Sequence, residues 1–186
     1  MLSMLTIVFA AAPAVAAPKP ALSSRECVAV EVVQTVGERQ RVVSRGRAKR
    51  EAPTVSVAKT VDLELQVRMR PVLEGDHVLR LELFTPRGYL YQTMTLPFRF
   101  VSPREVRAAR GEKTTRSVAG FPRPLEVQLL TTQRRRRPTS NLVTARLPVA
   151  GTSIALGSLL GKWKAVPHID DRAAPCGPAA SFVIAE

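Results

Sequence analysis

Strict alternation of apolar and polar residues constrains the fold of this chain more than any other feature. In "TVDLELQVRMR" (60–70), the apolar residues on one face are Val61, Leu63, Leu65, Val67 and Met69. The residues between them are polar or charged. Because successive side chains of a strand point to opposite faces, this period of two predicts a half-buried antiparallel strand.

Similar segments recur along the chain, separated by turn residues. They are 27–36 (with Val28, Val30 and Val32 on one face), 60–70, 77–85, 89–100, 124–130, 142–149, 161–169 and 181–186. Only "SPREVRAARGE" (102–112) favours a helix, and a short one. The sequence therefore predicts an all-β fold, an immunoglobulin-like antiparallel sandwich of about eight strands.

Three connections carry local signals. The turn residues of "PVLEGD" (71–76) predict a hairpin between the strands on either side. "TPRG" (85–88) places Pro second and Gly fourth, as in a type I turn. Pro97 cannot donate a ladder hydrogen bond, so it predicts a sheet edge or a bulge.

The N-terminal residues are typical of an export signal. Residues 1–17 are apolar and end in small residues that fit the A-x-A cleavage rule, although no Lys or Arg precedes the apolar run. The alternative is a buried helix or strand. We expect a signal peptide at 1–17, a first strand and basic linker at 18–60, and the main body of the sandwich at 61–186. The expected location is periplasmic, cell-surface or secreted, without a transmembrane anchor.

The chain has two cysteines, Cys27 and Cys176, near opposite ends of the expected mature protein. In an oxidising compartment such a pair predicts a disulfide. Two free buried thiols are the alternative. There is no C-x-x-C, which argues against redox or zinc chemistry through paired cysteines.

The last segment, from 151 to 186, resembles the closing strand pair of bacterial secreted immunoglobulin-like modules. The matching residues are Gly161, Trp163, Asp170, Phe182 and Ile184. Ala165 replaces the usual bulky residue, and "RAAPCGP" stretches the final turn. The resemblance implies an exported sandwich with an adhesive or structural role and no catalytic residues.

Positive charge is the main functional signal. The formal net charge is +13, with a pI near 11.1, and the excess gathers in basic stretches at 37–51, 104–116 and 131–140. The candidate anion-binding residues are Arg134, Arg135, Arg136, Arg137, Arg45, Arg47, Lys49 and Arg50. Arginine binds phosphate and carboxylate through a bidentate fork. The expected partner is an anionic surface, a polysaccharide or an acidic protein; a solvated loop without a partner is the alternative.

Two further interpretations of the basic stretches remain open. A nucleic-acid-binding role is disfavoured, because only 5% of residues are aromatic and single-strand binders stack bases on aromatic side chains. "RAKRE" (47–51) has the form that eukaryotic secretory convertases cleave, which would leave a domain starting at Glu51. The sequence does not decide whether the three basic stretches share one end of the sandwich.

The chain lacks the residue sets that most catalysis requires, so we expect no enzyme, no cofactor and no metal. The alternative is a small metal-dependent hydrolase around His168, Asp170 and Asp171. His77 reads as a solvated turn residue. "GSLLGK" (157–162) lacks the spacing of a phosphate loop.

The aromatic residues fit a sandwich interior. Trp163 is expected in the core, as strand tryptophans of sandwiches usually are. Tyr89 and Tyr91 are expected on one strand face, packed in the core or at an edge.

Overall fold

The computed structural model describes residues 26–36, 39–44, 52–71, 73, 75–109, 114–131, 141–157 and 159–186. Its longer strands are β1 (Cys27–Val36), β2 (Arg39–Ser44), β4 (Asp62–Met69), β5 (Gly75–Phe84), β6 (Leu90–Val101), β10 (Leu142–Pro148), β11 (Gly161–Ile169) and β12 (Ala180–Ala185). The short strands are β3 (Thr54–Ser56), β7 (Thr115–Arg116), β8 (Leu125–Glu126) and β9 (Gln128–Thr131). An all-β fold is thus confirmed.

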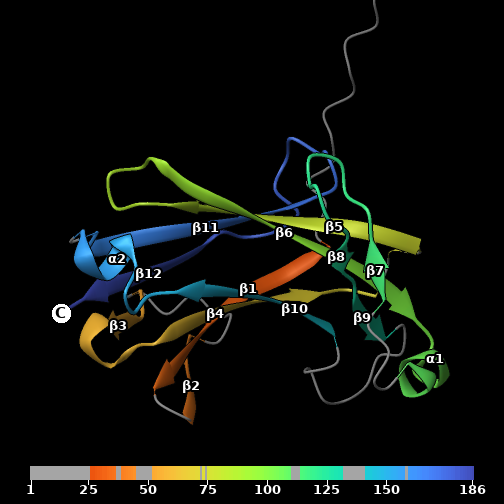
Figure 1. The fold of residues 1–186 in the computed structure, drawn as a ribbon, viewed down its shortest axis with the longest axis horizontal. Coiled ribbons are helices and arrows are strands. Elements are labelled where there is room, and N and C mark those ends of the chain that lie inside the picture. Colours follow the sequence, from red (N-terminus) through yellow and green to blue (C-terminus); the bar gives the residue numbers. More distant parts are fainter. Residues whose placement is uncertain are drawn as a thin grey trace, which may run out of the picture.

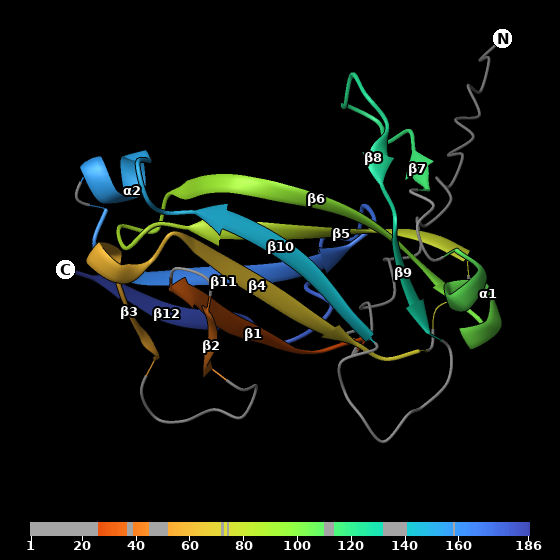
Figure 2. The ribbon, with the colours of Figure 1, turned by 60° about the horizontal axis from the view of Figure 1, so that its bottom comes forward.

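Two sheets lie face to face, and most of their longer strands run along the long axis of the molecule (Figures 1 and 2). The four-stranded sheet has the order β10-β4-β1-β2 and is antiparallel throughout. The six-stranded sheet has the order β3-β12-β11-β5-β6-β9; its β12–β3 and β6–β9 pairs are parallel. β7 and β8 form a separate small hairpin.

Alternate residues of both sheets fill one core between the layers. Leu63, Leu65, Val67 and Met69 of β4 are buried, as the alternation predicts. Val61 is 49% exposed, because β4 begins only at Asp62. The core joins the two layers into one packed unit.

The alternation of β1 breaks at its first residues. Val30 and Val32 are buried as expected, but Val28 is 41% exposed. The pairing of β1 with β4 shifts between Cys27 and Ala29, so Cys27 takes the inward position at this end. A bulge turns the strand in a way that period counting does not detect.

The predicted hairpin across 71–76 is wrong. β4 pairs with β1 and β10, whereas β5 pairs with β6 and β11 in the other sheet. The connection therefore crosses between the two layers. Alternation identifies which face of a strand is buried. It does not show whether the next strand along the chain lies in the same sheet or in the opposite sheet, because the face is buried equally well in both cases.

Two other local predictions are confirmed. In the Thr85–Gly88 turn the Gly88 amide donates to the Thr85 carbonyl at 2.9 Å, and Gly88 has a φ of 82°. Pro97 lies on β6 directly before Phe98, where pairing with β9 begins. No strand pairs with the outer edge of β6 at Pro97 among the described residues, so the missing N–H group of this proline breaks no hydrogen bond there.

The two short helices are α1 (Pro103–Ala108) and α2 (Ser153–Leu156). α1 falls within the segment predicted to be helical. Its capping box joins Ser102 and Glu105, with Pro103 in the first turn. α2 is a single turn that places Ile154 in the core, too short for its periodicity to be recognised.

Candidate functional site at the α1 end

Every predicted anion-binding residue lies outside the described residues: Arg134, Arg135, Arg136, Arg137, Arg45, Arg47, Lys49 and Arg50. The strands that flank these basic stretches are described, however. They fix where each stretch leaves the sheets and where it returns.

The second and third basic stretches leave the six-stranded sheet side by side. β6 and β9 run parallel, and their last paired residues are Val101 and Thr131. The chain after Val101 enters α1, and the chain after Thr131 continues into the arginine run. Figure 2 shows α1 and the end of β9 at the same end of the molecule, here called the α1 end.

The arginine run departs and returns at one point. The Thr131 hydroxyl lies 3.3 Å from the Asn141 Oδ1 atom, to which it donates. Asn141 directly precedes β10, whose first residue, Leu142, pairs with Arg68 of β4. The two described residues that flank 132–140 thus lie together at the α1 end.

α1 adds exposed cations beside this point. Arg104 and Arg107 are both exposed, and the Arg107 Nε atom donates to the Pro103 carbonyl at 3.2 Å. The acidic residue of α1, Glu105, accepts from the Ser102 amide at 2.7 Å. Hydrogen bonds to Ser102 hold the pKa of this carboxyl below its ordinary value.

The first basic stretch joins the sheets elsewhere. Val36 and Arg39 pair where β1 turns into β2, beside the start of β4 and away from the α1 end. Residues 45–51 run from Ser44, opposite Val32, to β3 beside the C-terminal strand. Only the second and third stretches are flanked by the same end of the sandwich.

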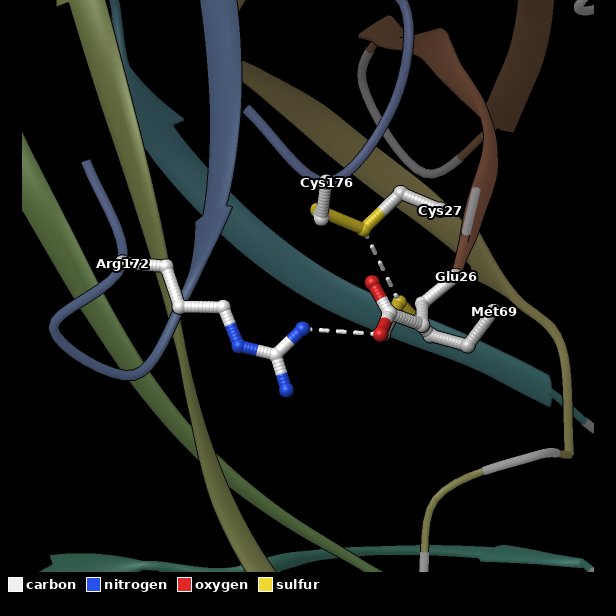
Figure 3. The surroundings of a disulfide bond; sticks show 5 residues. All are labelled: Glu26, Cys27, Met69, Arg172 and Cys176. Atoms are coloured by element: carbon white, nitrogen blue, oxygen red, sulfur yellow. Dashed lines mark hydrogen bonds and ion pairs between the residues drawn. A yellow bond between two sulfur atoms is a disulfide. The ribbon is translucent and has the colours of Figure 1, made fainter. Parts of the chain in front are cut away.

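The α1 end is also the cross-linked end. Cys27 and Cys176 form a disulfide that closes a separation of 149 residues, with both side chains buried (Figure 3). The predicted disulfide is therefore present. The Cys27 amide donates to the Cys176 carbonyl at 3.0 Å, and its Sγ lies 3.6 Å from the Met69 Sδ.

Charge pairing surrounds this disulfide. The Arg172 guanidinium contacts the Glu26 carboxylate at 2.8 Å, as Figure 3 shows, and the Arg70 amide donates to the Glu26 carbonyl at 2.8 Å. The backbones also approach closely. A Cβ on Gly177 would lie 2.1 Å from the Cys27 carbonyl oxygen, so only glycine fits there.

The His168, Asp170 and Asp171 side chains do not converge. His168 lies 3.6 Å from Glu82, and Asp171 pairs with Arg80. Asp170 has a φ of 54°, accepts from the Val78 amide at 3.0 Å and contacts the His77 ring at 3.0 Å. Within the described ranges, no group of three His, Cys, Asp or Glu residues could hold a metal ion.

The prediction for His77 is wrong. It lies on β5 rather than in a turn, its side chain is mostly buried, and its ring packs on Phe98 with centroids 5.7 Å apart. The contact with Asp170, 93 residues away, has no signal in the sequence.

Trp163 is fully buried, as predicted, and stacks on Phe182 with centroids 6.3 Å apart. Tyr91 meets the Trp163 ring edge-on at 5.2 Å. Tyr89 precedes β6 and is 71% exposed, so the two tyrosines do not share a packed face.

Comparison with models of protein families, with curated proteins and with solved structures found no significant match. None of the helices in the described residues has the length and apolar character needed to cross a membrane. The assignment of function therefore depends on the arrangement at the α1 end.

Proposed function

We propose that this chain is an exported, non-enzymatic binding or structural module. In this proposal, the basic segments at the α1 end contact an anionic surface or partner. The main support for this proposal is the parallel pairing of Val101 with Thr131. Because the two residues are neighbours, the two arginine-rich segments that follow them begin at the same place.

The electrostatics of the sheets support this assignment. Carboxylates of the body contact cations of the body: Glu31 with Arg68, Asp76 with Arg99, Glu64 with Arg146, Glu26 with Arg172, and Asp171 with Arg80. Four adjacent guanidinium groups repel one another, and burying them without anions would be costly. An external anion is the natural counter-charge for Arg134 to Arg137.

We also propose that the fold is immunoglobulin-like. In support, the last two strands, β12 and β11, adjoin β5 and β6 in one sheet, and β4 lies between β1 and β10 in the other. This order corresponds to strands G, F, C and C′ facing A, B and E. The disulfide departs from the usual pattern, because it joins β1 to the loop before β12.

Export is part of the proposal. Its support is the buried Cys27–Cys176 disulfide, since such bonds persist in oxidising compartments. The N-terminal apolar segment, 1–17, lies outside the described residues.

The test replaces Arg134, Arg135, Arg136 and Arg137 with serine. We expect retention on heparin, or affinity for anionic vesicles at moderate salt, to fall at least about tenfold, since each cation near an anionic surface contributes about 1 kcal/mol. The melting temperature should hardly change, because the described strands do not include these four residues.

The matched control replaces Arg45, Arg47, Lys49 and Arg50 with serine. It removes the same charge from the segment between β2 and β3, and β3 pairs with the C-terminal strand away from the α1 end. The control should retain most of the binding. Equal losses in the two variants would show an effect of net charge alone and contradict a site at the α1 end.

A further inference from the structure

The sheet edges of this molecule are protected unequally. β2 carries Arg39 and Arg41, β3 has three residues, and β9 has four. The outer edge of β10 is capped by a side chain. The side-chain amide of Gln128, on β9, donates to the Thr144 carbonyl and accepts from the Thr144 backbone amide, both at 2.9 Å, and so replaces a neighbouring strand. Charge, shortness and side-chain capping are the usual protections of an exposed edge.

The first half of β6 has none of these three protections, although its pairing with β5 shifts at Tyr91, between the pairs Leu83–Gln92 and Phe84–Leu90. Its segment 90–96, "LYQTMTL", contains no charged residue and no proline. β5 pairs with one side of it, while β9 pairs with the other side only from Phe98 onward. No strand among the described residues pairs with the outer edge of 90–96, which leaves about 20 Å of backbone open to a partner.

Apolar side chains are exposed at the start of this edge. Leu90 is 53% and Tyr89 is 71% exposed. The Tyr91 hydroxyl lies 2.9 Å from the Ser153 Oγ, which places α2 beside β6, and Leu156 of α2 is 80% exposed. Figure 1 shows α2 and the Thr85–Leu90 turn at the same end of the molecule.

We propose that a second copy of this chain pairs with the open edge of β6, strand to strand and antiparallel, so that one sheet continues through a twofold dimer. An open edge requires a strand, because only another backbone satisfies its row of N–H and C=O groups. A chain with a net charge of +13 can approach its own copy most closely through an uncharged segment.

The segment is self-complementary in one register. If the twofold axis passes beside Thr93, this exposed residue faces Thr93 of the second copy, and Gln92 faces the second copy's Met94. Cross-strand Thr–Thr pairs are favourable, and no charged residue lies within the paired segment 90–96. A twofold axis makes both copies contribute the same patch.

The test compares the wild-type chain with Thr93→Lys by analytical ultracentrifugation over a range of concentrations. The wild type should dimerise, and Thr93→Lys should weaken the dimer at least about tenfold, because two lysines would face each other across the axis. Thr115→Lys is the matched control, since Thr115 is an exposed strand threonine on β7 with the same change of charge. It should leave the dimer intact.

Salt gives a second measurement. Dimerisation should strengthen as salt rises, because salt screens the repulsion between two basic chains, whereas binding to an anionic surface should weaken. A wild-type chain that stays monomeric at all concentrations would overturn the proposal and leave the edge to a strand of a different protein. A dimer that Thr93→Lys leaves intact would also overturn it, because the contact would then lie elsewhere.

Discussion

The two ends of the sandwich are held together in different ways. At the α1 end, a disulfide and the Arg172–Glu26 ion pair tie β1 to the loop before β12. At the opposite end, Trp163 packs between Tyr91 and Phe182, and its indole donates to the Leu159 carbonyl at 2.9 Å. Both ends pack aromatic rings, since Phe98 contacts His77 and Phe100 near the α1 end, but the α1 end adds a covalent cross-link.

The difference follows the distribution of charge. Thr131, which precedes the arginine run, lies at the α1 end beside the exposed Arg104 and Arg107 of α1. A covalent bond holds the backbone there whatever the local charge. Burial of apolar surface contributes at both ends, through Phe98 at the α1 end and Trp163 at the opposite end.

The largest expected effect comes from removing the disulfide. Cys27→Ala with Cys176→Ala should lower the free energy of unfolding by about 4–5 kcal/mol in the chain-entropy model, because a closed loop of 149 residues is released. Chemical denaturation measures the loss. Hydrogen exchange should show it first at the α1 end, beginning at the Cys27 amide; equal loss of protection at both ends would erase the contrast between them.

Trp163→Ala tests the opposite end. The side chain is fully buried, so its removal should cost about 3–5 kcal/mol through lost burial and the cavity left behind. The disulfide should still form, as a thiol assay on the folded variant can show. If free thiols appear, the two ends are not independent and the comparison fails.

The smallest effect concerns α1. Hydrogen bonds to Ser102 lower the pKa of Glu105 in the folded state. The ionised carboxylate therefore stabilises the start of the helix fully when the pH lies above the ordinary pKa of a glutamate. This contribution is lost as the pH falls through the lowered pKa. The Ser102 amide resonance should follow that titration, and Glu105→Gln should abolish it. A titration that persists in Glu105→Gln would assign the effect to another group.

Local patterns sufficed for part of the fold. The alternation of 60–70 predicted which residues of β4 are buried, and the segment 102–112 predicted the short helix that α1 forms. The Cys pair followed from the cysteine count. Each of these features depends on residues close in sequence or on a chain with only two thiols.

Long-range pairing decided the rest. The β4–β5 connection crosses between sheets, and His77 meets Asp170, although neither has a local signal. The parallel pairing of β6 with β9 brings together Val101 and Thr131, 30 residues apart, from which two basic stretches continue.

By itself, the sequence predicted most of the longer strands and the buried face of most of them, the cysteine pair and the basic stretches, but it missed β2, β3 and β7. Only the tertiary structure decided which strands are neighbours, which two basic segments share an end and which edge stays open. The physical reason is that side-chain periodicity specifies a face, whereas strand order depends on how two complete sheets close over a common core.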